Sequence, residues 1–142
     1  MSDDWVIDHA VCIHVDGQGR RFSGVPTSKF FSLSEQHMYR HIVMWNVAGE
    51  THETRQGNIE RLIQSFLSLR GLIPGLLHLE IGVDTSRVDY ACDVVLYSEF
   101  DCQASLDAYA THPEHLRVKA ELGDIRTARH QVDYEVADGR CT

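Results

Sequence analysis

Hydrophobic and polar positions first alternate over residues 39–47, a segment rich in aromatic and β-branched side chains. Such residues favour an extended backbone, in which successive side chains point to opposite faces. One face of this predicted strand carries Tyr39, His41, Val43, Trp45 and Val47. The other face mixes polar and apolar side chains, so we expect both faces to be partly buried.

The pattern changes to helical spacing over residues 54–69. Apolar side chains recur there every three or four positions and form a single stripe. The stripe consists of Ile59, Leu62, Ile63, Phe66 and Leu69. Gly71 and Pro74 follow shortly afterwards and predict the end of the helix.

Two further strands are predicted after this helix. Residues 77–83 alternate between apolar and polar side chains, which indicates a half-buried strand. Residues 84–89 are polar and predict a turn. Residues 90–98 predict the next strand, and the apolar run at residues 94–97 indicates burial on both of its faces.

The second half of the domain begins with a helix over residues 103–110. Asp101 precedes it and is of a residue type that caps helices. Pro113 cannot continue this helix, so the chain is expected to break there before another short helix over residues 114–122. Gly123 is a favourable residue for the end of that helix.

The last predicted strand covers residues 127–136. One of its faces carries Arg129, Gln131, Asp133 and Glu135. The order strand, helix, strand, strand, helix, strand predicts an α+β fold of the ferredoxin-like βαββαβ type with a four-stranded antiparallel sheet. Helices on one face leave the other face apolar and open, which is an aggregation hazard. Two sheets paired face to face across a twofold axis would hide it, so we predict a dimeric α/β barrel.

The chain divides into three predicted parts: a leader over residues 1–37, a domain over residues 38–136 and a tail over residues 137–142. Within the leader, residues 5–15 and 21–31 have strand character, and Asp16-Gly17-Gln18-Gly19 between them has turn chemistry. Two interpretations stay open. The leader is a β-hairpin lying on the domain or on a partner subunit, or it is a flexible extension.

Charge and composition exclude several classes of function. The net charge is −8, with 13 Lys and Arg against 21 Asp and Glu. Binding to nucleic acid or to an anionic membrane needs a basic surface, so neither partner is expected. No apolar run is long enough for a membrane span, and the acidic N-terminus is unlike a secretory signal, so a cytoplasmic location is expected.

The four cysteines are predicted to be free thiols. They are Cys12, Cys92, Cys102 and Cys141. None forms a C-x-x-C pair, and a cytoplasmic protein seldom holds structural disulfides. We expect no tight metal site, because no three or four ligand-type side chains have the spacing that such a site needs, and we expect no cofactor; weak binding of Mg²⁺ at backbone carbonyls stays open.

Several motifs resemble one known family. In chain order they are Y-R-H-I-V-M-W, G-L-I-P-G-L, S-E-F-D, L-D-A-Y-A-T-H-P-E-H-L and V-D-Y-E-V. This series resembles the stress-responsive A/B barrel (Dabb) family over residues 38–136. The resemblance implies a homodimeric α+β barrel. The family includes plant stress-induced proteins and polyketide cyclases such as olivetolic acid cyclase, and many members have no assigned reaction.

Four side chains are candidates for chemistry. They are His41, Tyr109, His112 and His115. If the helices pack on the sheet, these groups converge on a cleft between the two layers. A histidine can remove a proton next to a carbonyl, and a tyrosine hydroxyl can donate to the oxygen that becomes negative. The resemblance implies that Tyr109 and His115 are a catalytic pair and that His41 lies in the same pocket.

Structural roles compete with these functional ones. His112 can cap the following helix, Tyr109 can pack in the core, and His41 can be a core histidine with a satisfied hydrogen bond. Three functions therefore stay open: a pocket for a small apolar or aromatic ligand, an enzyme, and a non-enzymatic, stress-linked oligomeric protein. The enzyme would be a cyclase-like lyase or a cofactor-free monooxygenase. In the latter Trp45 would line the substrate cavity; the alternative is that Trp45 faces the dimer core.

Overall fold

The structure, a computed structural model, describes residues 7–8, 11–12 and 37–137. The chain forms two compact units, Met1–Leu33 and Ser34–Thr142. In the first unit, β1 (Ile7–Asp8) pairs antiparallel with β2 (Val11–Cys12). Because these two segments pair with each other, residues 5–15 do not form the single strand that we predicted. The rest of the predicted hairpin lies outside the described residues and stays a prediction.

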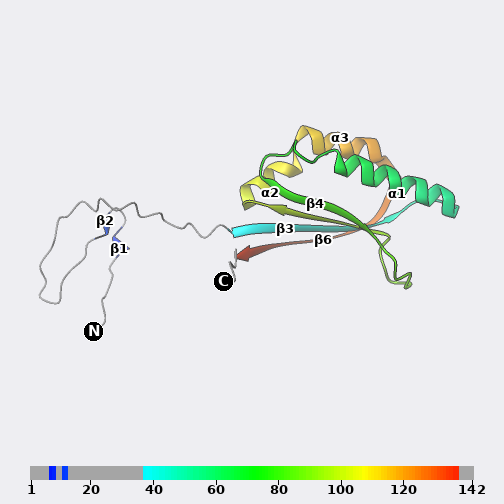
Figure 1. The fold of residues 1–142 in the computed structure, drawn as a ribbon, viewed down its shortest axis with the longest axis horizontal. Helices are drawn as coiled ribbons and strands as arrows, with labels where there is room; N and C mark the ends of the chain where they lie inside the picture. The colour runs from blue at the N-terminus through cyan, green and yellow to red at the C-terminus, as the bar shows by residue number, and fades with distance from the viewer. Residues whose placement is uncertain (1–6, 9–10, 13–36, 138–142) are drawn as a thin grey trace, which may run out of the picture. The chain divides into compact units, whose positions relative to one another are not determined.

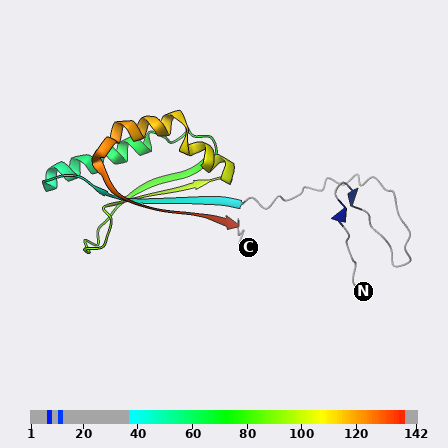
Figure 2. The ribbon, with the colours of Figure 1, turned by 180° about the vertical axis from the view of Figure 1, so that it is seen from behind.

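The second unit has the ferredoxin-like fold that the sequence predicts. Its four strands form one antiparallel sheet in the order β4–β5–β3–β6. The strands are β3 (His37–Val47), β4 (Leu76–Val83), β5 (Val94–Phe100) and β6 (Arg126–Ala137). The helices are α1 (His52–Leu67), α2 (Gln103–Ala110), α3 (Pro113–Leu122) and the 3₁₀ turn η1 (Gly123–Ile125). All three α-helices lie on one face of the sheet (Figures 1 and 2).

The core fills the space between the sheet and the helices. Alternate residues of β3 and β5 point towards the helices, and most of these side chains are buried; on β3 they are the residues that the alternation predicts to share one face. Phe66 on α1 and Phe100 on β5 are essentially inaccessible to solvent, and the ring of Trp45 stacks on Phe66 at 5.3 Å between centroids. Burying a side chain of this size contributes about 1.5–3 kcal/mol, so this layer fixes the helices over the sheet.

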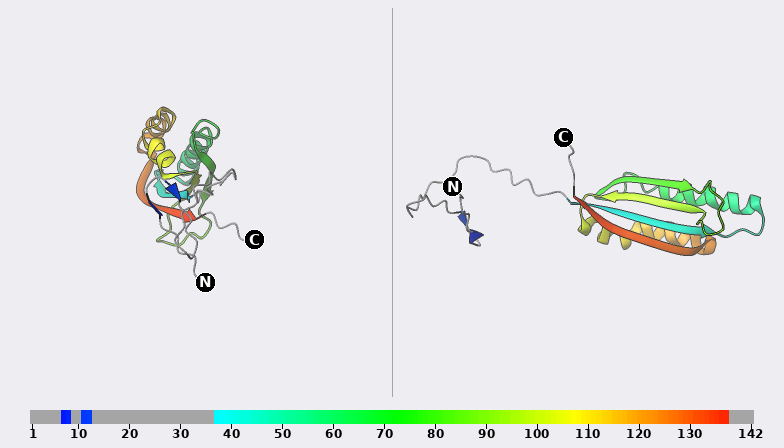
Figure 3. Two further views of the ribbon diagram at one scale, coloured as in Figure 1. Left: turned by 90° about the vertical axis from the view of Figure 1, so that its left-hand side faces the viewer. Right: turned by 90° about the horizontal axis from the view of Figure 1, so that it is seen from below.

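In the described part of the chain, no helix covers the opposite face of the sheet, as the end-on view in Figure 3 shows. Val132 on β6 lies opposite Ile42 on β3 and is 56% exposed, and Tyr134 is 39% exposed. On β5, Val95 and Tyr97 are only half-buried, so the prediction that residues 94–97 are buried on both faces is wrong for the single chain. The reason is that the described helices cover only one face of the sheet, so side chains on the other face stay accessible to solvent in a single chain.

Several element boundaries differ from the prediction because of hydrogen bonds that the pattern does not reveal. Helix α1 begins at His52 rather than residue 54, since the side chain of Thr51 accepts from the backbone N–H of Thr54. Strand β5 begins at Val94, not at residue 90, and the Tyr90 side chain is 87% exposed. The loop before Val94 is fixed at Asp93, because the carboxylate of Asp93 accepts a hydrogen bond from the backbone N–H of Val47 at 2.7 Å.

The cap of α2 was predicted wrongly. Cys102, not Asp101, occupies the N-cap position, and its side chain makes no capping hydrogen bond. The carboxyl of Asp101 instead takes part in hydrogen bonds with Ser105 and Cys102, which lower its pKa. The helix itself covers Gln103–Ala110 as expected. None of the described helices is long and apolar enough to cross a membrane.

Candidate functional site

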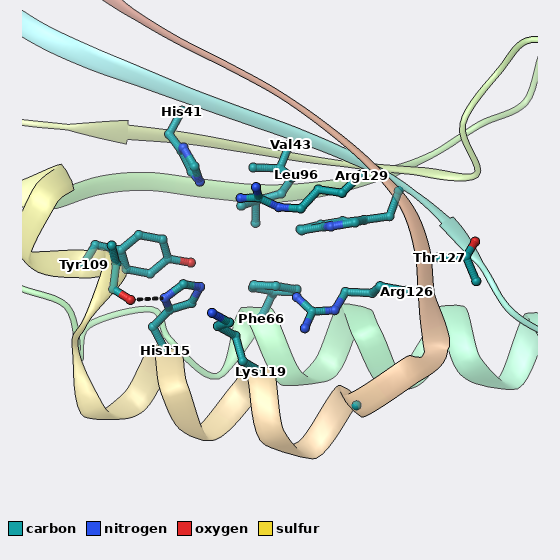
Figure 4. A pocket seen from close by; sticks show the side chains of 13 residues that line it. His41, Val43, Phe66, Leu96, Tyr109, His115, Lys119, Arg126, Thr127 and Arg129 are labelled. Carbon is teal, nitrogen blue, oxygen red and sulfur yellow. Dashed lines mark hydrogen bonds between the residues drawn. The ribbon is translucent and has the colours of Figure 1, made fainter.

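A cavity of about 380 Å³ lies between the sheet and the helices (Figure 4). Its volume is at the lower end of the range for small-molecule pockets, about 300–1,000 Å³. The polar side chains that line it are His41, Tyr109, His115, Lys119, Arg126, Thr127 and Arg129. They come from β3, α2, α3 and β6, so the cavity exists only because the fold brings these elements together.

His41 reaches the cavity from the middle of β3. It is only 7% exposed, and its Nδ1 lies 2.6 Å from Oδ1 of Asp133, the residue opposite it on β6. A carboxylate can only accept, so Nδ1–H of His41 donates this hydrogen bond. The tautomer and the ring orientation are thereby fixed, and Nε2 is left for other partners.

Tyr109 lies near the C-terminal end of α2 and is 3% exposed. Its hydroxyl is buried and has no hydrogen-bond partner in the protein. Burial also raises the pKa of this hydroxyl, so it stays protonated and available as a donor. A buried polar group without a partner costs about 1–3 kcal/mol. The hydroxyl points into the cavity (Figure 4), where a ligand oxygen would satisfy it.

His115 lies in the first half of α3 and stacks on the ring of Tyr109, with centroids 4.1 Å apart. Its Nδ1 is 3.3 Å from the carbonyl oxygen of Ala110, which accepts the hydrogen bond. Burial lowers the pKa of His115, and the positive charge of Lys119 acts in the same direction, while the hydrogen bond to Ala110 opposes them. The imidazole is therefore neutral at pH 7, with Nε2 as a free base.

Trp45 belongs to the helix side of the sheet and lines the cavity. The guanidinium of Arg126 lies over its ring, 5.6 Å from the centroid, and over Phe66 at 6.0 Å. The wall formed by Trp45, Phe66 and Arg126 thus combines two apolar rings with the positive charge of one guanidinium.

A family model described as "Stress responsive A/B Barrel Domain" matches residues 39–136. The chain belongs to the stress responsive A/B barrel domain family. A comparison with curated protein sequences finds no match.

Solved structures share the fold of this A/B barrel chain. A dimeric ferredoxin-like protein of unknown function from Bacteroides fragilis is 28% identical, with a TM-score of 0.62 over 70% of this chain and 96% of the other. One from a Jannaschia species is 29% identical, with a TM-score of 0.56 over 70% and 99%. The hydroxynitrile lyase from Passiflora edulis is 18% identical, with a TM-score of 0.61 over 72% and 96%, which shows the fold alone.

The A/B barrel fold brings together three of the four chemical candidates. His41, Tyr109 and His115 line the cavity, together with Trp45, whereas His112 is not among the lining residues. The Nδ1 of His112 accepts from the backbone N–H of Glu114 and caps α3, as the structural alternative predicted. Catalytic and ligand-binding roles for these residues stay predictions.

Sequence reasoning did not identify four further residues of this A/B barrel site. They are Asp133, Lys119, Arg126 and Arg129. The alternation of the last strand places Asp133 and Arg129 on the same face, which was a usable signal. The pairing of His41 with Asp133, however, depends on the register between β3 and β6, which the sequence does not specify. Among residues 37–137, no three His, Cys, Asp or Glu side chains lie close enough together to hold a metal ion.

Proposed function

We propose that this domain binds a small organic molecule in the cavity and removes a proton next to its carbonyl group, as a cyclase-like lyase does. The observation that carries the proposal is the buried hydroxyl of Tyr109, which has no hydrogen-bond partner in the protein and belongs to a ring that stacks on the imidazole of His115. A donor without a partner beside a neutral base is the combination that enolate formation requires.

In this reaction His115 is the base. Its Nε2 takes a proton from the carbon next to the carbonyl, and the C–H electron pair forms a C=C bond while the carbonyl π electrons move to oxygen. The hydroxyl of Tyr109 donates to that oxygen as its charge develops. A positioned base contributes about 10²–10⁴-fold to rate. Loss of an oxyanion donor costs about 10²–10³-fold.

His41 supplies a second proton-transfer group in the same cavity. The hydrogen bond to Asp133 orients its ring and engages Nδ1–H, so its Nε2 lone pair can take a proton from a substrate hydroxyl and return it to a substrate oxygen after a carbon–carbon bond forms or breaks. The Passiflora edulis protein of this fold is a hydroxynitrile lyase, which supports lyase chemistry as a use of this architecture.

The active form in this proposal is a homodimer. The Bacteroides fragilis and Jannaschia proteins are described as dimeric, and both are more than a quarter identical to this chain. The apolar side chains on the face without helices, including Ile42 and Val132, would pack against the same face of a second copy. Burial of this face against a second copy would remove it from water.

A thermal-shift screen with aromatic ketones tests the pocket and its chemistry. We expect some ketones to raise the melting temperature of the wild type, and this effect to be lost in His115→Ala and reduced in Tyr109→Phe. Tyr90→Phe is the matched control, because Tyr90 is 87% exposed and does not line this cavity.

The ketones that bind are then assayed for exchange of their α-protons in D₂O by NMR. Wild type should accelerate the exchange, and His115→Ala should lose about 10²–10⁴-fold. The proposal would be wrong if no ketone stabilised the wild type, or if stabilisation and exchange persisted in both site variants.

A further inference from the structure

Three cationic side chains line the cavity and take no part in the proposed proton transfer. They are Lys119 on α3 and Arg126 and Arg129 on β6. The described residues that line this cavity include no aspartate or glutamate. The whole chain has 21 acidic residues against 13 Lys and Arg, so a wholly cationic set is contrary to its composition.

Arg126 is partly buried and has an unsatisfied hydrogen-bond donor. Its Nε is buried without a hydrogen-bond partner, and its guanidinium is held over Trp45 and Phe66. Burial lowers the pKa of Arg126, and the nearby charge of Arg129 lowers it further. An anion in the cavity would satisfy the unpaired donor and relieve the repulsion between the two guanidinium groups.

The three cationic side chains lie near the Tyr109 hydroxyl, which takes part in the proposed proton transfer. In Figure 4 the nitrogen ends of Lys119, Arg126 and Arg129 point into the space that the Tyr109 hydroxyl also faces. The charges of Arg126 and Arg129 oppose the effect of burial on the pKa of Tyr109, so their positive field reaches its hydroxyl. The cavity thus combines three positive charges and the Tyr109 donor with the Nε2 acceptors of His41 and His115, and no acidic side chain is among the described residues that line it.

An adjoining hollow of about 340 Å³ defines the other end of the site. It shares His41, Tyr109, His115 and Arg129 with the first cavity, and its lining also includes Asp107 and Asp133. Asp133 already accepts hydrogen bonds from His41 and Gln131. These two aspartates do not line the first cavity, so an anionic ligand group is favoured there over the adjoining hollow.

We propose that the cavity selects small aromatic carboxylates, with the carboxylate between Arg126 and Arg129 and the planar body against Val43, Phe66 and Leu96. This inference rests on the proposed function and specifies its substrate as an aromatic acid that also bears a carbonyl group. A guanidinium suits this task because its planar fork matches the two oxygens of a carboxylate.

Benzoate, benzamide and benzamidine test the inference, because they share one planar shape and carry charges of −1, 0 and +1. Ligand-detected NMR titrations of the full chain give the three dissociation constants. We expect benzoate to bind at least about tenfold more tightly than benzamide, which corresponds to about 1.4 kcal/mol, and benzamidine not to bind.

Variants assign the selectivity to the two arginines. Arg126→Gln and Arg129→Gln should each weaken benzoate about tenfold and leave benzamide unchanged. Arg55→Gln is the control, since Arg55 is exposed on α1 and does not line the cavity. If Arg126→Gln fails to fold, as judged by circular dichroism, Arg129→Gln carries the same comparison.

The outcomes separate the two proposals. Equal affinity for benzoate and benzamide, or unchanged benzoate affinity in both variants, would overturn the selectivity while the ketone screen still supports the pocket. If benzoate fails to bind and aromatic ketones do bind, only the carboxylate inference is wrong. If neither set of compounds binds the wild type, the pocket and the inference are both wrong.

Discussion

Tyr109 and His115 are held in states that cost free energy in the unliganded protein and that a bound ligand would stabilise. The hydroxyl of Tyr109 is buried without a partner, and burial keeps His115 neutral by lowering its pKa. Both features disfavour the unliganded protein slightly, which is common where a site must act on a bound molecule. The consequences can be measured at each residue.

Removal of the Tyr109 hydroxyl should not destabilise the protein. In Tyr109→Phe the unpaired buried oxygen is lost while the ring contacts with Phe100 and His115 remain. We expect the free energy of unfolding in urea to stay constant or to rise by up to about 1 kcal/mol. A loss of about 1 kcal/mol or more would mean that the hydroxyl has a structural partner, and Tyr90→Phe provides the baseline.

The lowered pKa of His115 predicts a specific pH dependence of stability. Its ordinary pKa is 6.5, and the folded-state pKa is lower, so between these values the unfolded chain binds more protons. The free energy of unfolding should therefore fall as the pH drops below 6.5 and should not change through this group above 6.5.

Melting temperatures of wild type and His115→Gln between pH 5 and 8 check this prediction. The variant should lose less stability than wild type on acidification. His52→Gln, a change at an exposed histidine on α1, should follow the wild-type curve. Parallel curves for wild type and His115→Gln would contradict the assignment.

At the scale of elements, α3 depends on its cap. The imidazole of His112 accepts from the N–H of Glu114, and Pro113 occupies the first turn. His112→Ala should cost about 0.5–2 kcal/mol in urea unfolding, as for other lost helix caps, and His112→Asn should recover most of it. Ligand affinity, measured well below the unfolding transition, should not change. A loss of affinity larger than the loss of stability would give His112 a role in binding.

The sequence predicted elements best where local chemistry decides them. Pro113 and Gly123 set the ends of α3, and the alternation along β3 correctly placed His41 and Trp45 on one face of the strand. It failed at Tyr90, where apolar content suggested a strand but the backbone turns and the ring is exposed. That failure occurs because a strand needs a partner, and pairing is not a local property.

The candidate site was predictable to a similar extent. His41, Tyr109 and His115 were found from their chemistry and motifs, and the fold gathers them in one cavity. Asp133 and Arg126 were missed. The contact between Asp133 and His41 depends on the register of two strands, and the position of Arg126 in the site depends on the packing of its guanidinium over an aromatic ring. Contacts of this kind appear only once the tertiary structure is known.

At the scale of the whole molecule, the face of the sheet without helices predicts self-association. Val132→Glu would place a charge on this face, opposite Ile42. Light scattering should give the wild type a mass of twice 16.1 kDa and the variant a mass near 16.1 kDa. Ala120→Glu, at an exposed position of α3, should stay dimeric. A wild type that is monomeric in dilute solution would contradict the homodimer.

The most direct test of the site is the affinity of acetophenone for wild type and for Tyr109→Phe, measured by ligand-detected NMR. The ketone oxygen should accept from the Tyr109 hydroxyl, and such a bond contributes about 0.5–1.5 kcal/mol. We therefore expect the dissociation constant to rise about two- to tenfold in the variant. Equal constants for the two proteins, or no binding to the wild type, would contradict a ligand at this hydroxyl.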